Sequence, residues 1–147
     1  MKHSHTTTTT ANVSPGEVWD VLEDFAEYPR WNNVVPRAAG ALRKGTWLHV
    51  SACLGAPARR FRLKVVSARE PGDLFMTVYW VHPRLLHLRY SITIEEAGTR
   101  QAKIQQWWHL RGLLAARYWP RVRDRLDALE RMAQRLAHEA ERKWGDP

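Results

Sequence analysis

The last third of the sequence places its apolar residues three or four positions apart. An α-helix turns once in 3.6 residues, so this spacing puts them on one face of a helix that follows Leu113. The apolar stripe consists of Ala115, Tyr118, Trp119, Val122, Leu126, Leu129, Ala133, Leu136, Ala137 and Ala140. We expect Pro120 to lie within the first turn or two of the helix and to mark where the helix properly begins, because proline disrupts a helix interior. A helix of roughly 25 residues spans about 37 Å, so it needs a broad apolar surface to cover.

The middle of the chain changes to a period of two, which is typical of strands with one buried face. The segment LHLRYSITIEE shows it best, with the inward set Leu86, Leu88, Tyr90, Ile92 and Ile94. Short turns separate the strands, among them Lys44–Gly45, Pro71–Asp73 and Ala97–Gly98. We expect two strands within 37–54, and one each within 58–70, 74–81, 86–96 and 97–110. Such short connections predict an antiparallel meander.

The beginning of the chain adds one strand and two small helices. The threonine-rich segment HTTTTTANV is β-branched and predicts a strand. Ser14 then caps a helix, with Pro15 at its first position and Glu17 completing a capping box. A second helical piece starts after Asp24, is broken by Pro29 and resumes around Trp31.

Together these elements predict an α+β fold. A curved antiparallel sheet of six to seven strands wraps around one long C-terminal helix, and two short helices follow the first strand. At 147 residues, with 44% hydrophobic residues, the chain suits a single domain over residues 1–147 with an ordered core over about 6–140. The single cysteine, Cys53, excludes an intramolecular disulfide and suits a reducing compartment. No signal sequence and no apolar run of about 18 residues occurs, so we expect a cytoplasmic protein without a transmembrane segment.

Several short segments resemble one family. They are SPGEVWDVLEDFAEYPRWN after the first strand, KGTWLHV, EPGDLF, GTR before the last strand, and RGLLA before the terminal helix. In this order they are similar to the START/Bet v 1-like superfamily, in particular its polyketide cyclase/dehydrase and lipid-transport branch. The resemblance covers about residues 6–140 and implies the helix-grip fold. It also implies a cavity between sheet and helix that binds lipids, hormones or polyketides, with cyclase or aromatase activity in some members.

The predicted inward positions identify candidate ligand-binding residues. Tyr90 alternates with the inward aliphatic residues of its strand, and Gln106 and Trp108 belong to the more apolar set of the last strand. A buried phenol or amide needs a hydrogen-bond partner, which a ligand could supply. Aromatic walls suit a flat or lipophilic guest, and the candidates are Trp31, Trp80, Tyr90, Gln106, Trp108 and Trp119. In the alternative interpretation the protein's own rings fill the space.

Motifs for catalysis are weak. The sequence has no glycine-rich phosphate loop and no CxxC pair, and HEAER at His138 is not the HExxH of zinc enzymes. His82 and His87 lie on opposite sides of a predicted turn, and Cys53 has no identifiable base. We therefore expect no metal and no cofactor, and name no catalytic residue. Cyclase or aromatase activity stays an open alternative to binding alone.

The charge points to a second class of function. The formal net charge is +8 and the isoelectric point is about 10.2, which would suit an interaction protein on a ribosome, RNA or an anionic membrane. The basic residues, however, are dispersed along the strands and the terminal helix. Asp124, Asp127 and Glu130 interrupt those on the helix at ion-pairing distance. We therefore expect a small-molecule partner and regard nucleic acid as unlikely, and the sequence does not indicate an oligomeric state.

Overall fold

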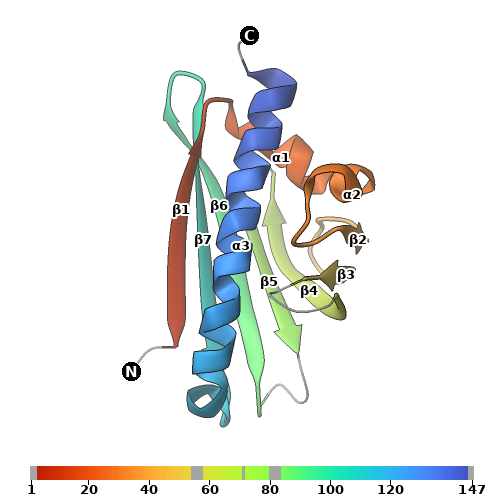
Figure 1. Cartoon of the computed structure of the whole chain (residues 1–147), viewed down its shortest axis with the longest axis vertical. Coiled ribbons are helices and arrows are strands. Elements are labelled where there is room, and N and C mark those ends of the chain that lie inside the picture. Colours follow the sequence, from red (N-terminus) through yellow and green to blue (C-terminus); the bar gives the residue numbers. More distant parts are fainter. Residues whose placement is uncertain (1–2, 54–57, 71, 80–83, 146–147) are drawn as a thin grey trace.

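The computed structural model describes residues 3–53, 58–70, 72–79 and 84–145. Figure 1 shows one curved sheet with a long helix lying along its inner face. The elements in chain order are β1 (Ser4–Ala11), α1 (Pro15–Glu23), the 3-10 helix η1 (Phe25–Glu27), α2 (Tyr28–Trp31), β2 (Arg37–Ala39), β3 (Trp47–Ala52), β4 (Arg59–Arg69), β5 (Asp73–Tyr79), β6 (His87–Gly98), β7 (Gln101–Arg111) and α3 (Ala115–Trp144).

The strands form a seven-stranded sheet in the order β1-β7-β6-β5-β4-β3-β2. Strands β2 to β6 each pair with the next strand along the chain, and every pair is antiparallel. The first strand, β1, forms the edge of the sheet opposite β2 and pairs with the last strand, β7. The predicted α+β helix-grip fold, with short helices after the first strand and one long terminal helix, is confirmed.

The alternation in β6 and β7 sets which side chains face α3. In β6 and at the residue just before it, the predicted set Leu86, Leu88, Tyr90, Ile92 and Ile94 is buried. In β7 the buried set is Ala102, Ile104, Gln106, Trp108 and Leu110. The inward positions of both strands are therefore those that the sequence pattern predicts, and Trp107 lies half-buried on the opposite face.

The predicted start of α1 is confirmed in detail. The Ser14 hydroxyl accepts a hydrogen bond from the Glu17 backbone N–H at 3.3 Å. The Glu17 carboxylate accepts one from the Ser14 backbone N–H at 3.0 Å, which completes the capping box. The buried face of the helix consists of Val18, Trp19, Val21 and Leu22. Two of the helix's free N–H groups are thus satisfied locally, which fixes α1 directly after β1.

Two predictions about proline are wrong. Pro29 does not break the second helical piece, since η1 passes directly into α2 and Pro29 takes one of the first two positions of α2. A backbone N–H there has no partner within the helix, so proline loses nothing. Pro120 lies within the first two turns of the terminal helix, as predicted, but it does not mark the start, since α3 begins at Ala115 and continues without a break to Trp144. The start is held by the Leu114 N–H, which donates to the Leu85 carbonyl at 3.0 Å.

Glu139 ties α3 to α2. Its carboxylate is buried and accepts hydrogen bonds from Arg30 of α2 and from Arg142 one turn further along α3. Arg30 also pairs with Glu27 of η1 at 3.1 Å. Burial alone would raise the pKa of Glu139, but the hydrogen bonds of Arg142 and Arg30 outweigh it and lower the pKa to about 2. The short helices are therefore fastened to α3 by a charge that persists in mild acid.

We expect Glu139→Gln to lower the free energy of unfolding at pH 7 by roughly 2–3 kcal/mol, because two arginines lose their carboxylate. A lowered pKa stabilises the fold above the usual carboxyl pKa. This contribution is lost as the pH falls from about 4.5 towards about 2. Urea denaturation across this range should show the variant and the wild type converging in acid. Asp127→Asn, which changes an exposed carboxylate of the same helix, is the control, and a constant difference down to pH 2 would contradict the assignment.

Candidate ligand-binding cavity

An apolar cavity of about 130 Å³ lies between the inner face of the sheet, the short helices and α3. Because α3 packs most closely on β1 and β7, the part of the sheet towards β3 to β6 is covered less tightly. The sheet lines the cavity with residues such as Leu48, Met76 and Leu88, and α3 adds Leu129 and Met132. The short helices close the remaining side with Leu22, Phe25 and Tyr28.

The two phenols in the cavity wall are its main polar groups. Tyr28 donates a hydrogen bond through its hydroxyl to the Leu22 backbone carbonyl, so its own polar end is satisfied. Burial raises the pKa of Tyr28, and the nearby Tyr90 and Asp24 raise it further. Burial also raises the pKa of Tyr90, to about 12, although a hydrogen bond with Gln106 acts in the opposite direction. Both phenols are therefore neutral at physiological pH.

A buried hydrogen-bond chain leads from the edge strand to Tyr90. Thr7 of β1 lies directly opposite Gln106 of β7 and donates through its hydroxyl to the amide oxygen at 3.3 Å. The amide nitrogen of Gln106, which is 0% exposed, donates to the Tyr90 hydroxyl oxygen at 2.6 Å. Within the described part of the chain, the Tyr90 hydroxyl donates no hydrogen bond of its own. The Tyr90 hydroxyl proton thus has no acceptor among these residues.

Aromatic packing holds these groups in place. Tyr90 lies opposite Trp108 in the β6–β7 pairing, and the two rings stack with centroids 5.6 Å apart. On the other side of the cavity, Tyr28 is flanked edge-on by Phe25 at 5.3 Å and by Trp31 at 5.2 Å. Both phenols are therefore fixed by stacked or edge-to-face rings and not by chance contacts.

The six predicted site residues lie in different places. Tyr90 and Trp108 line the cavity, and Gln106 lies behind Tyr90. Trp31 packs behind Tyr28 and does not line the cavity, and Trp119 is buried on α3 next to His3. Trp80 lies outside the described residues. Whether any of these residues contacts a ligand stays a prediction.

Sequence reasoning missed several lining residues. Phe25, Phe61 and Met76 belong to the wall but were not among the candidates. Phe61 alternates with arginine on β4, so the period of two already placed it on the inner face. Phe25 could not be placed, because nothing in its local pattern shows how η1 turns towards the sheet.

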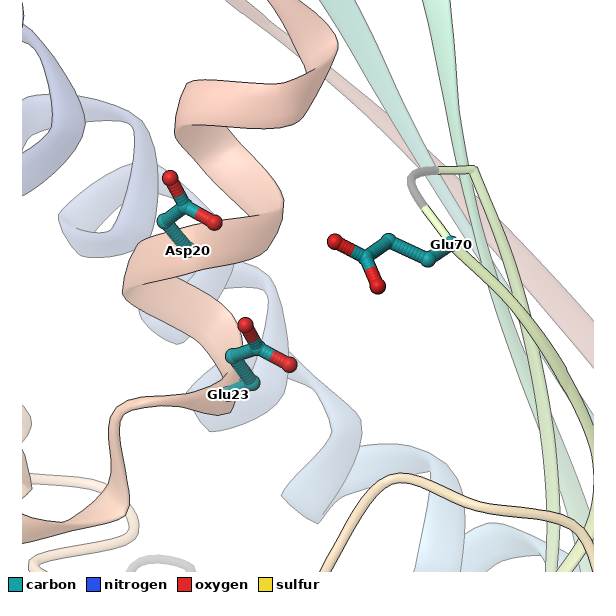
Figure 2. Close-up of side chains that lie close together, drawn as sticks. All are labelled: Asp20, Glu23 and Glu70. Atoms are coloured by element: carbon teal, nitrogen blue, oxygen red, sulfur yellow. The ribbon is translucent and has the colours of Figure 1, made fainter.

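An acidic cluster lies outside the cavity. Figure 2 shows Asp20 and Glu23 on α1 facing Glu70, which follows β4. Their carboxylate oxygens lie within 4.8 Å of one another, and all three residues are exposed. Partial burial and the charge of Glu70 raise the pKa of Glu23. The cluster is a patch of mutual repulsion, and exposed carboxylates alone do not define a metal site, so we assign none.

Comparison with known proteins places the chain in a family. Residues 2–140 match the family described as polyketide cyclase/dehydrase and lipid transport. The chain belongs to this family. No curated protein sequence matches the chain. No helix within the described ranges combines the length and apolar character that crossing a membrane requires.

Solved structures of several other proteins share this fold. Norcoclaurine synthase from Thalictrum flavum, solved with dopamine and hydroxybenzaldehyde, has a TM-score of 0.72 at 11% identity, with 97% of this chain and 88% of that chain covered. The Zhui aromatase/cyclase from a Streptomyces species has a TM-score of 0.69 at 14% identity, covering 95% and 94%. A START superfamily protein from Mycobacterium smegmatis has a TM-score of 0.62 at 17% identity, covering 89% and 97%. At these identities the likeness shows the fold alone.

The hydrogen-bond chain behind Tyr90 can be tested by stability. We expect Gln106→Leu to lower the free energy of unfolding by about 1–3 kcal/mol, because the amide's partners stay buried without it. Adding Tyr90→Phe should recover part of the loss, since one stranded polar group is then removed. Urea denaturation measures both, with Gln105→Leu on the opposite face of β7 as the matched control. Strictly additive losses would show that the two side chains are not coupled.

Proposed function

We propose that the protein binds a lipophilic or aromatic small molecule in the apolar cavity. The observation that carries the proposal is a partly open cavity whose wall is hydrocarbon and aromatic, with the side chains of Tyr28 and Tyr90 among its lining residues. Removing an apolar guest from water into such a space is favourable, and one donor suffices to orient it. The neighbouring norcoclaurine synthase, which was solved with single-ring aromatic compounds, supports the same class of ligand.

The size of the cavity limits the guest. Its volume of about 130 Å³ is below the few hundred Å³ expected for a ligand pocket of this kind. Apolar cavities of about 150 Å³ stay dry and bind benzene. We therefore propose a guest of about one aromatic ring, or a short aliphatic chain, and a larger ligand would require the lining side chains to move.

Binding is a better proposal than acid–base catalysis. The described residues that line the cavity include no histidine, carboxylate, lysine or arginine. The raised pKa of about 12 for Tyr90 makes it a hydrogen-bond donor and not a base at neutral pH. These lining residues therefore do not supply the general acid and general base that a cyclase or aromatase activity would use. As part of the proposal we place the protein in the cytoplasm, which the single cysteine supports.

Filling the cavity should abolish binding. We expect Ala52→Leu, which extends a lining residue at the end of β3, to weaken binding of toluene or benzaldehyde at least tenfold. The free energy of unfolding should fall by no more than about 3 kcal/mol. Isothermal titration calorimetry gives the affinity. Ser51→Leu adds a larger side chain at the adjacent position on the opposite face of β3 and should leave binding unchanged. Absence of any binding by the wild type would defeat the proposed function.

The Tyr90 hydroxyl should select ligands that carry an acceptor. We expect Tyr90→Phe to weaken binding of benzaldehyde roughly three- to tenfold, the value of one net hydrogen bond, and to leave toluene binding unchanged. The same calorimetric titration gives both affinities. Equal effects on the two ligands would mean that the hydroxyl proton does not point to the guest.

A further inference from the structure

The sheet has a second surface, the outer face, which is turned away from α3 and lies behind the sheet in Figure 1. Arg62 and Lys64 of β4, Arg89 of β6 and Arg111 of β7 lie on it, because they alternate with the inward residues of their strands. Lys64 pairs with Thr77, and Thr77 pairs with Arg89. Lys64 and Arg89 are thus two strands apart, or about 10 Å across the sheet.

Aromatic rings lie between these cations. Trp47 and Tyr79, which are 37% and 38% exposed, have ring centroids 6.3 Å apart. The Arg62 guanidinium lies 4.5 Å from the Trp47 ring centroid, and the Arg89 guanidinium lies 5.0 Å from that of Phe75. A groove of about 800 Å³ runs past Phe75, Tyr79, Arg89 and Arg111. We call this surface the basic–aromatic patch, defined by Trp47, Arg62, Lys64, Phe75, Tyr79, Arg89 and Arg111.

Among the residues that the structure describes, carboxylates are missing from this end of the outer face. Segments 28–69, 74–94 and 97–123 of the sequence contain no aspartate or glutamate. The acidic residues within the sheet, such as Asp73 and Glu95, pair with Thr93 and Lys103 towards its other end. In the portion of the chain that the structure describes, none of the four patch cations forms an ion pair.

The pKa of a neighbouring histidine, His109, is lowered by burial and in part by the charges of these arginines. His109 pairs with Arg89 across the β6–β7 ladder. Burial lowers the pKa of His109, and the charges of Arg111 and Arg89 lower it further. Arg62, Lys64, Arg89 and Arg111 therefore share one end of this face, although they are dispersed along the chain. The expectation that nucleic acid is an unlikely partner rested on that dispersal.

We propose that the basic–aromatic patch binds single-stranded nucleic acid. Guanidinium and ammonium groups would neutralise phosphates, and the partly exposed rings of Trp47 and Tyr79, which are tilted 55° to each other, would stack on unpaired bases. Exposed apolar side chains of Val66 and Leu113 also line the groove, so binding to an anionic membrane is the outcome that the test has to separate from binding of nucleic acid. The patch and the cavity lie on opposite faces of the sheet, so the proposal does not depend on the proposed function.

The test measures binding of labelled oligonucleotides of about 10 nucleotides by fluorescence anisotropy across a salt series. We expect single strands to bind more tightly than the matching duplex, with binding that is still measurable at about 150 mM salt. Each phosphate contact adds about −0.7 to the slope of log K against log salt, so three contacts predict a slope of about −2. RNA and DNA strands of the same sequence show whether the sugar is recognised.

Variants locate the binding. Arg62→Ala and Arg89→Ala should each weaken binding and reduce the salt slope by about 0.7. Tyr79→Ala should weaken binding roughly five- to a hundredfold without changing the slope, because stacking releases no counterions. Arg135→Ala removes one charge from an exposed position on α3 and should change affinity less than about twofold. Backbone amide shifts of β4 to β6 on adding the oligonucleotide to the wild type provide a reading that requires no variant.

Three results would overturn the proposal. An equal loss of affinity in Arg135→Ala and Arg89→Ala would show that only net charge matters. Equal affinity for duplex and single strand would exclude base stacking. Binding to phosphatidylserine vesicles without binding to either oligonucleotide would assign the patch to a membrane surface.

Discussion

The contact between the nearly straight α3 and a curved sheet governs the rest of this structure. A helix can follow such a sheet closely along only part of its width, and α3 does so over β1 and β7. At the other edge, η1 and α2 contact β2, while α1 contacts β6 and β7. The ion pair between Arg30 and Glu139 fastens α2 to α3. The apolar cavity lies between the sheet, these short helices and α3. The cavity thus exists because a straight helix cannot follow the whole width of a curved sheet. The polar groups beside it are the Tyr90 hydroxyl and the Gln106 and Thr7 side chains behind it.

The sequence predicted the architecture because its patterns are local. The period of two placed Tyr90, Gln106 and Trp108 on the inner face, and Ser14 with Glu17 placed the start of α1. Positions that depend on how elements meet could not be predicted in this way. Trp31 carries the same kind of ring as the lining residues, yet the turn from η1 into α2 aims it behind Tyr28. A list of aromatic residues therefore identified the wall only in part.

The distribution of charge on the surface could not be predicted from the sequence either. Along the chain, Arg62, Arg89 and Arg111 are separated by whole strands, and nothing in the sequence alone says that they share a surface. Strand pairing brings them to one end of one face, and it moves the acidic residues of the sheet to the other end. The distribution of charge in space is thus a property of the register, which a count along the sequence does not contain.

The pairing of the first strand with the last has a consequence for synthesis. Thr7 reaches its partner Gln106 across 99 residues of sequence. As the chain leaves the ribosome at about 5–20 residues per second, β1 has no partner for many seconds. An unpaired strand is a template for other chains. The threonine hydroxyls of HTTTTTA keep the unpaired strand hydrated. Threonine is also β-branched and so favours the extended backbone that the strand has in the sheet.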